Sequence, residues 1–324
     1  MAKPEAALVK DGPVSGTSDG ALQTQTTPLS GGLANVGMYK HKITTSLGPA
    51  DPITLVEKRM AKIARHQTEF DICKSLARQN RYGHGFSPLA QILSVSETDK
   101  NFTIVMPFYE GVGTKLEDWR THAKLFAQAV KRLNQTNLSV PTGNMMLTLL
   151  EQVKAAIQPN AECAAFTEQV LELFEAPAFT SAAQDTVKSH NDLYFPNAAI
   201  EANGDSYEVV FIDFGHMGCN QAGAEFHHFL RASALGLCDV EMVDIMFGEY
   251  ARITNREKFV IAANAHYFAL LRMSDRLRSL SGKEPQKHIY EREKAISDTL
   301  LSGAKDLQKL LLQTRTPPTV SPVD

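Results

Sequence analysis

Three polar side chains in the second half of the chain have the types and spacing that phosphoryl transfer requires. Asp192 and Asn197 lie in the run HNDLYFPN (190–197), and Asp213 follows in the run FIDFG (211–215). This reaction needs a carboxylate that accepts the hydroxyl proton, and oxygen ligands that hold Mg²⁺ on the nucleotide. The spacing therefore predicts Asp192 as the general base, with Asn197 and Asp213 as the metal ligands of a kinase.

The residues between these two motifs have the pattern of a strand hairpin. An apolar stretch at 198–200 leads to the turn sequence Asn-Gly-Asp at 203–205, and a strand-like run at 207–212 then ends at Asp213. Single triplets of the H-x-D or D-F-G type arise often by chance, and Asp or Asn in loops commonly caps turns. The order of the motifs and the hairpin between them favour the catalytic interpretation.

Other polar residues near these motifs indicate less specific roles. His190 is interpreted as a brace of the catalytic loop rather than as a proton carrier. Glu225 is predicted either to brace that loop or to contact a cationic substrate. The neighbouring His227 and His228 do not indicate a metal site, because adjacent side chains on a helix point about 100° apart.

The first part of the chain carries a candidate phosphate-binding loop, LSGGLAN (29–35). Gly31 and Gly32 let main-chain N–H groups approach a phosphate closely, and the side chains of Ser30 and Asn35 add donors. Paired glycines are also common in flexible turns. Their position just before a predicted strand favours the binding of a nucleotide, ATP.

Lys58 ends the next predicted strand, and Glu69 lies in the helix that follows. Period-two alternation places Lys58 on the same face as Val56, from which it can reach the nucleotide phosphates. Glu69 is predicted to orient this lysine through an ion pair. Lys62 and Glu57 are alternatives for the two roles.

A later predicted strand, at 102–108, runs into the connection between two lobes. Main-chain groups from Met106 to Phe108 are predicted to pair with the edge of adenine. The same residues also fit a buried core strand followed by a loop, and the two interpretations are compatible.

The pattern of the elements predicts an α+β protein with the bilobal layout of a kinase, a small β-rich lobe followed by a larger helical lobe. Strands are expected at 37–46, 53–58, 89–95 and 102–108, with a helix at 59–79. Further helices are expected at 116–134, 145–157, 163–174, 239–252, 256–280 and 290–312. The predicted domains are a tail at 1–25, a nucleotide-binding lobe at 26–111, a helical lobe with the catalytic loop and substrate site at 112–312, and a tail at 313–324.

Composition and net charge limit the kinds of molecule that the protein is expected to bind and the compartment in which it is expected. The 324 residues are 43% hydrophobic and 21% charged, and the net charge of −3 gives no electrostatic reason to expect nucleic acid as a partner. No apolar stretch is long enough to span a bilayer, and residues 1–22 lack the apolar core of a secretory signal. Four widely spaced cysteines indicate neither zinc nor disulfides and favour a cytoplasmic protein.

The motifs together resemble those of the aminoglycoside phosphotransferase and choline kinase superfamily. HNDL through Asn197, followed by IDF at 212–214, is similar to the catalytic motifs of that group. LSGGLAN resembles the nucleotide loop of choline, ethanolamine and thiamine kinases, and the spacing of Asn220 after Asp213 is similar to the choline kinase branch. The resemblance runs from residue 29 to about residue 230. It implies a protein-kinase-like bilobal fold that uses ATP and Mg²⁺ to phosphorylate a hydroxyl of a small molecule.

The same resemblance implies roles for single residues. Asp192 corresponds to the base, Asn197 and Asp213 to the metal ligands, and Lys58 to the lysine that contacts phosphate. The chain departs from the choline branch at Gly215, where an acid is usual, and its only tryptophan precedes the catalytic loop. The implied acceptor is therefore a hydroxyl compound such as an amino alcohol, an aminosugar or a related cationic metabolite.

Acidic residues of the helical lobe leave room for a cationic acceptor pocket, although most of them also fit a solvated face; they are Glu225, Asp239, Glu241, Asp244 and Glu249. Two alternatives stay open. A protein serine/threonine kinase is disfavoured, because the helical pattern resumes soon after 217–220 and leaves little chain for docking a peptide. A catalytically idle, ATP-binding regulator is disfavoured by the presence of all three catalytic side chains.

Overall fold

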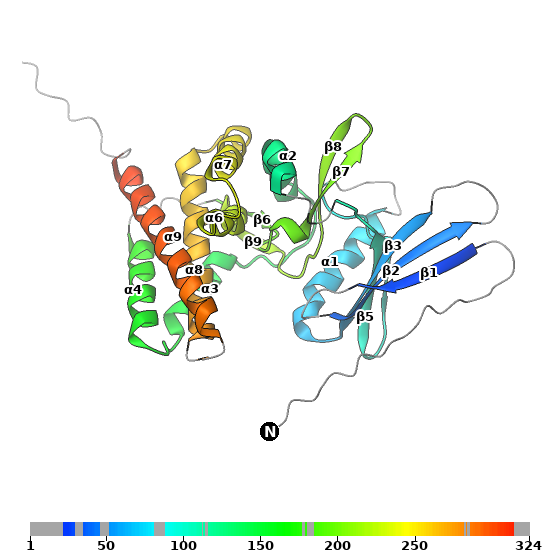
Figure 1. The fold of residues 1–324 in the computed structure, drawn as a ribbon, viewed down its shortest axis with the longest axis horizontal. Helices are drawn as coiled ribbons and strands as arrows, with labels where there is room; N and C mark the ends of the chain where they lie inside the picture. Colours follow the sequence, from blue (N-terminus) through cyan, green and yellow to red (C-terminus); the bar gives the residue numbers. More distant parts are fainter. Residues whose placement is uncertain are drawn as a thin grey trace, which may run out of the picture. The chain divides into compact units, whose positions relative to one another are not determined.

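The computed structural model describes residues 22–29, 35–45, 52–80, 88–111, 113, 116–176, 179, 185–281, 283 and 286–313. The chain divides into two compact units (Figure 1). The smaller unit comprises Met1–Gly85 and Ala90–Tyr109, and the larger comprises Phe86–Leu89 and Glu110–Asp324. The predicted α+β organisation, with a small β-rich part and a larger, mainly helical part, is confirmed.

In the described part of the smaller unit, five strands form an antiparallel sheet beside one helix. The strands are β1 (Leu22–Pro28), β2 (Asn35–Thr45), β3 (Ile53–Ala61), β4 (Ser94–Glu97) and β5 (Asn101–Pro107), in the order β1-β2-β3-β5-β4. The helix α1 (Ala64–Asn80) packs on this sheet, where Phe70 stacks on Phe102 of β5 with ring centroids 4.3 Å apart. Cys73 and Leu76 of the same helix are also buried.

The edge strand β1 was not predicted. It begins at Leu22, inside the segment expected to be a tail, and its sequence LQTQTTP lacks alternating apolar residues. An edge strand is held mainly by main-chain hydrogen bonds to its neighbour, here β2, and much of its side-chain surface faces solvent. A polar sequence therefore forms this strand without a hydrophobic pattern to reveal it.

Two boundaries in this unit also differ from the prediction. The helix was expected to start at Arg59, but β3 continues to Ala61 because Met60 is buried opposite Phe102. The strand expected at 89–95 is replaced by β4 at Ser94–Glu97. In both places the tertiary contact, rather than the local pattern, sets where the element ends.

The larger unit is built around the long helix α8 (Lys258–Leu280), which contacts α3, α4, α6, α7 and α9. Its other described helices are α2 (Leu116–Asn134), α3 (Met145–Ala155), α4 (Ala161–Glu175), α6 (His227–Ala234), α7 (Val240–Thr254) and α9 (Lys287–Gln313). The sequence predicted all of these within a few residues except α6, which spans only eight residues. None of the helices in the described ranges is both long and apolar enough to cross a bilayer.

Two strand pairs of the larger unit enclose the predicted catalytic motifs. β6 (Thr186–Ser189) pairs antiparallel with β9 (Gly218–Gln221), and β7 (Ala198–Asn203) forms a hairpin with β8 (Ser206–Phe211). The hairpin lies beside α2 (Figure 1). Phe126 of α2 meets Phe211 of β8 edge-on, with ring centroids 5.5 Å apart. The segment HNDLYFPN thus lies between β6 and β7, and Asp213 lies between β8 and β9.

Candidate active site

The strand pairs bring the predicted catalytic side chains to one region of the larger unit. β6 ends at Ser189, and the short 3-10 helix η1 (Phe195–Asn197) closes the loop that carries Asp192. The main-chain N–H of Ile212 donates to the carbonyl of Asn197 at 3.0 Å. Since Asp213 follows Ile212 directly, the residues predicted as metal ligands come to the same end of the β7–β8 hairpin.

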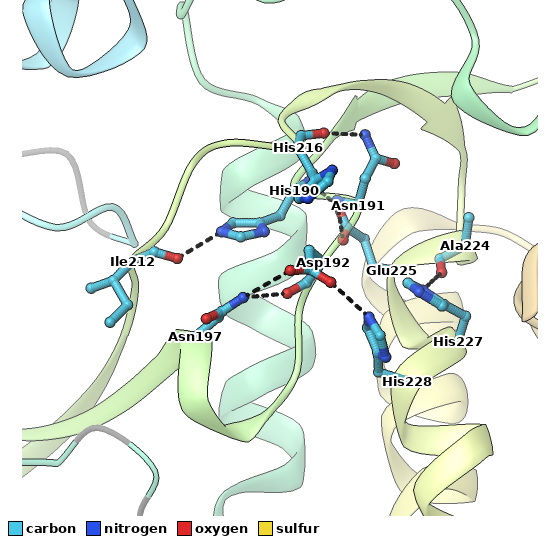
Figure 2. Close-up of polar contacts among 10 residues, drawn as sticks. All are labelled: His190, Asn191, Asp192, Asn197, Ile212, His216, Ala224, Glu225, His227 and His228. Carbon is cyan, nitrogen blue, oxygen red and sulfur yellow. Dashed lines mark hydrogen bonds and ion pairs between the residues drawn. The ribbon is translucent and has the colours of Figure 1, made fainter. Parts of the chain in front are cut away.

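The Asp192 carboxylate is held by two hydrogen bonds, one on each oxygen (Figure 2). Asn197 Nδ2 donates to Asp192 Oδ2 at 3.2 Å and to the Asp192 carbonyl at 2.8 Å. His228 Nε2 donates to Oδ1 at 2.9 Å. Burial tends to raise the pKa of Asp192, but the bond from His228 and the nearby histidines outweigh it and hold the pKa below its ordinary value. Because 21% of the side chain is exposed, an oriented, ionised carboxylate can still accept a further hydrogen bond.

The orientation of the Asn197 amide fits a metal ligand. Both of its bonds to Asp192 end on acceptors, so the amide nitrogen must face Asp192 and the amide oxygen faces away (Figure 2). Asp213 is exposed and has φ of 65°, a left-handed conformation that is uncommon outside glycine and is often found at functional sites. Among the described residues no group of three or more His, Cys, Asp or Glu side chains gathers for a metal. One amide and one carboxylate oxygen suit Mg²⁺, which takes most of its other ligands from water and phosphate.

His190 braces the catalytic loop, in agreement with its interpretation from the sequence. The side chain is fully buried, and Nε2 donates to the carbonyl of Ile212 at 2.9 Å. Burial lowers the pKa of His190, which keeps the ring neutral. The ring therefore ties the loop to the residue that precedes Asp213.

The structure places Glu225 at the back of the catalytic loop, not at a substrate surface. Its carboxylate is 1% exposed, and it accepts from the main-chain N–H groups of His190 at 2.5 Å and Asn191 at 3.3 Å. Burial raises the pKa of Glu225 to about 7, although these two bonds favour the ionised form. Of the two roles left open by the sequence, the substrate contact is therefore wrong and the brace is observed.

Replacing Glu225 with Gln is expected to lower the free energy of unfolding by about 1–3 kcal/mol, because an amide N–H of the new side chain must face a main-chain N–H of the loop. This loss of unfolding free energy should shrink as the pH rises from 4.5, the ordinary pKa of a glutamate side chain, to about 7, the pKa of Glu225 in the folded protein. In this window the unfolded wild-type carboxyl releases its proton while the folded one keeps it, so wild-type stability falls.

Urea unfolding of both proteins across this pH range measures the difference. Glu172→Gln, at an exposed position on α4, is the matched control and should change the unfolding free energy little. A difference between wild type and Glu225→Gln that stays constant with pH would contradict the titration of Glu225.

A network of asparagines fixes the same loop from its other side. Asn191 has φ of 64°, and its Nδ2 donates to the carbonyl of His216 at 2.9 Å. Asn220 of β9 donates from Nδ2 to Asn191 Oδ1 at 2.8 Å and accepts from the main-chain N–H of Met146 at 3.3 Å. Asn220, singled out by the family resemblance, thus couples the loop to the start of α3.

His228 is the functional residue that the sequence did not identify. From the sequence, His228 was examined only as a possible metal ligand beside His227. The sequence gives no sign of its contact with a loop that precedes it by more than 30 residues. Its side chain is 19% exposed, and burial lowers its pKa despite the neighbouring carboxylate. A neutral ring with its proton on Nε2 therefore orients Asp192.

His228→Ala is expected to lower the turnover number of the predicted phosphoryl transfer about tenfold or more, because a hydrogen bond to an ionised carboxylate is worth about 1.5–3 kcal/mol. The affinity for ATP should stay the same. His288→Ala, at an exposed position on α9, is the matched control and should leave the turnover number unchanged. Steady-state kinetics of the three proteins makes the comparison, and an unchanged turnover number in His228→Ala would show that Asp192 needs no such positioning.

In the smaller unit Lys58 and Glu69 form the expected ion pair. Lys58 Nζ lies 2.6 Å from Glu69 Oε1, and both side chains are more than nine-tenths buried. The alternatives pair elsewhere at the surface: Lys62 with Glu97 at 2.5 Å, and Glu57 with Arg59. An ion pair withdrawn from water is held in one geometry, so the lysine is positioned before any ligand binds.

The other predicted nucleotide contacts are described only in part. Ser30, Gly31 and Gly32 lie outside the described residues, and Asn35 is the first residue of β2. Met106 is buried in β5, whereas the N–H of Phe108 donates to the carbonyl of Thr54 at 3.0 Å. That N–H therefore serves the sheet, and pairing of the other main-chain groups from Met106 to Phe108 with adenine stays a prediction.

The remaining acids proposed for a cationic pocket are paired with basic side chains. Glu249 lies 2.8 Å from Arg252, and Asp244 lies 2.5 Å from Lys258. Asp239 and Glu241 both contact Arg120, at 2.9 and 3.4 Å. These carboxylates are neutralised within the protein, and none of them lies at the catalytic loop.

Comparison with solved structures identifies the fold. The chain is similar to a microcompartment-associated aminopropanol kinase, with a TM-score of 0.58 and 12% identity over 90% of this chain and 93% of that one. It is also similar to choline kinase from Streptococcus pneumoniae, with a TM-score of 0.56 and 11% identity over 88% and 93% of the two chains. That kinase has also been solved in complex with AMP.

A third similar structure is an aminoglycoside phosphotransferase from Streptomyces rimosus, with a TM-score of 0.50 and 17% identity over 76% of this chain and 91% of that one. No protein-family model matches the chain, and no curated protein matches it by sequence. At these identities the likeness establishes the fold. The protein-kinase-like fold that the motifs predicted, shared with choline kinases and aminoglycoside phosphotransferases, is confirmed.

Proposed function

We propose that this chain, which has the protein-kinase-like fold, transfers the γ-phosphoryl group of ATP to a hydroxyl of a small molecule. The observation that carries the proposal is the ionised Asp192 carboxylate, held by Asn197 and His228 at the end of the hairpin that delivers Asp213. A fixed carboxylate beside oxygen ligands for Mg²⁺ is the arrangement that phosphoryl transfer uses.

Asp192 accepts the proton of the acceptor hydroxyl as its oxygen attacks the γ-phosphorus. A bond forms between that oxygen and phosphorus, the bond from phosphorus to the β–γ bridging oxygen breaks, and ADP leaves. Asn197 and Asp213 would hold Mg²⁺, which would neutralise charge on the phosphate oxygens. Lys58, oriented by Glu69, contacts the nucleotide phosphates. The AMP complex of the similar choline kinase and the predicted cytoplasmic location support ATP as the donor.

A small acceptor is favoured over a protein substrate by the length of one segment. β8 ends at Phe211, and β9, which pairs with β6 beside the catalytic loop, already begins at Gly218. The chain thus returns to the loop at once, and α6 begins at His227. This connection has no length for an extended segment on which a peptide could dock.

The test is ADP release from Mg²⁺·ATP by the purified protein with a panel of acceptors. The panel contains uncharged, cationic and anionic small hydroxyl compounds and a generic protein substrate. Stimulation by one small compound, absent in Asp192→Asn, is the expected result. Stimulation by the protein substrate alone, or an equal rate in Asp192→Asn, would overturn the proposal.

A further inference from the structure

A cavity of about 250 Å³ lies beside the candidate base in the larger unit. Its polar wall is contributed by α6 and α8, through His227, His228, Arg231, Arg272, Arg276 and Ser279. His228 belongs both to this wall and to the site, because its Nε2 lies 2.9 Å from Asp192 Oδ1 (Figure 2). A molecule in the cavity that reaches past His228 would bring its other end toward Asp192.

Positive charge exceeds negative charge on this wall. Arg231 and Arg276 share one fully buried carboxylate, Glu293, at 2.5 and 2.9 Å. Within the described residues no ion pair or hydrogen bond engages the guanidinium of Arg272, which is half-buried. One acid, Asp275, also lines the cavity, but it is paired with Arg278. The wall thus presents guanidinium groups whose charge the protein does not fully neutralise.

Guanidinium groups in a partly enclosed site select for anions. Their planar, multiple N–H donors match the oxygens of a carboxylate or a phosphate, and low solvent exposure strengthens the attraction. The basic cluster also affects the neighbouring rings: burial, together with Arg272 and Arg231, lowers the pKa of His228. A cationic amine placed in this cavity would face the same repulsion.

His227 gives a second polar contact that the protein leaves open. Its Nδ1 donates to the carbonyl of Ala224 at 2.9 Å, and burial holds its pKa well below the ordinary value. Nε2 of the neutral ring is therefore an acceptor, and it has no hydrogen-bond partner among the described residues although the side chain is 98% buried. Because His227 lines the cavity, a hydroxyl or N–H group of a bound molecule that came within reach of Nε2 would satisfy this atom.

We propose that the cavity binds the anionic group of the phosphoryl acceptor, which is a hydroxyl compound bearing a carboxylate or a phosphate. This inference rests on the proposed kinase function and narrows its substrate class. It replaces the expectation of a cationic acceptor, since the acids expected to form a cationic pocket are paired with Arg120, Arg252 and Lys258.

The first experiment measures anion binding without catalysis. Sodium glycerate and inorganic phosphate are titrated into protein labelled with ¹³C at histidine, and the ring signals of His227 and His228 are followed by NMR. Both anions should produce a saturable shift, and choline chloride should produce none. Arg272→Gln should raise the dissociation constant about tenfold or more, and Arg272→Lys, which keeps the charge, should raise it less.

Arg252→Gln, which removes one positive charge from the same unit away from the cavity, is the matched control and should leave the dissociation constant unchanged. Thermal unfolding verifies that each variant is folded. The absence of a saturable shift with both anions, or an equal dissociation constant in Arg272→Gln and wild type, would overturn the proposal.

The second experiment measures phosphorylation of three-carbon acceptors that differ in charge: glycerol, serinol, glycerate and glycerol 3-phosphate. The anionic acceptors should have the highest kcat/KM, and Arg272→Gln should raise their KM more than it lowers kcat. If the anions bind in the cavity but no acceptor is phosphorylated, the result contradicts the proposed kinase function and supports the anion-binding site. If serinol is the preferred acceptor and Arg272→Gln has no effect, the kinase function stands and the anionic class is overturned.

Discussion

Asp192→Asn is expected to reduce phosphoryl transfer by about 10²–10⁴-fold, the range over which general-base catalysis contributes. The amide cannot accept the hydroxyl proton. It also cannot keep both hydrogen bonds of the carboxylate, because Asp192 accepts from Asn197 on one oxygen and from His228 on the other. The new NH₂ group must face one of these donors, so orientation is lost together with basicity.

The rate of Asp192→Asn is measured under saturating ATP and acceptor, with the affinity for ATP determined separately. That affinity should change little, since the substitution leaves Lys58 and Asp213 in place. Asp205→Asn, in the exposed turn of the same hairpin, makes the same chemical change away from the site and should retain the wild-type rate. A wild-type rate in Asp192→Asn would remove Asp192 from the role of base.

Asp213→Asn is expected to weaken the affinity for Mg²⁺·ATP about tenfold or more and to reduce turnover by about 10²-fold or more, because one charged metal ligand becomes neutral. Asn is the appropriate substitution, since Asp213 has φ of 65° and Asn tolerates the left-handed region better than Ala. A change in function then reports the loss of the ligand rather than strain in the main chain.

ATP binding is measured over a range of Mg²⁺ concentrations and again in EDTA. Wild type should bind ATP more tightly as Mg²⁺ is added, and Asp213→Asn should lose most of this increase. In EDTA the two proteins should bind ATP similarly. The same Mg²⁺ dependence in both proteins would show that Asp213 holds no metal.

The grouping of Asp192, Asn197 and Asp213 into one triplet could be predicted, because it depends on neighbouring segments of the chain. Asp192 and Asn197 are separated by one turn of loop and 3-10 helix, and the β7–β8 hairpin then delivers Asp213. Each of these steps has a sequence pattern of its own. The Lys58–Glu69 pair follows in the same way from a strand and the helix after it.

The contacts that hold the triplet could not be predicted, because they join segments far apart in the chain. His228 of α6 and Glu225, which lies just before α6, reach the loop of Asp192 from beyond β9, and nothing local in the sequence marks that they meet it. The positions of charged residues in the sequence also did not reveal which acidic and basic side chains form ion pairs. Asp244 and Glu249 have an acidic pattern that suits a cationic pocket, yet each meets a basic side chain of its own or the following helix.

The most direct test of the kinase function follows the γ-phosphoryl group itself. ATP labelled with ³²P at the γ-position is incubated with Mg²⁺, wild-type protein or Asp192→Asn, and an acceptor that stimulates ADP release. Wild type should transfer the label to an organic phosphate ester of the acceptor, and Asp192→Asn should leave it in ATP. Label that appears only as inorganic phosphate, or that stays in ATP with wild type as well, would contradict the proposed kinase function.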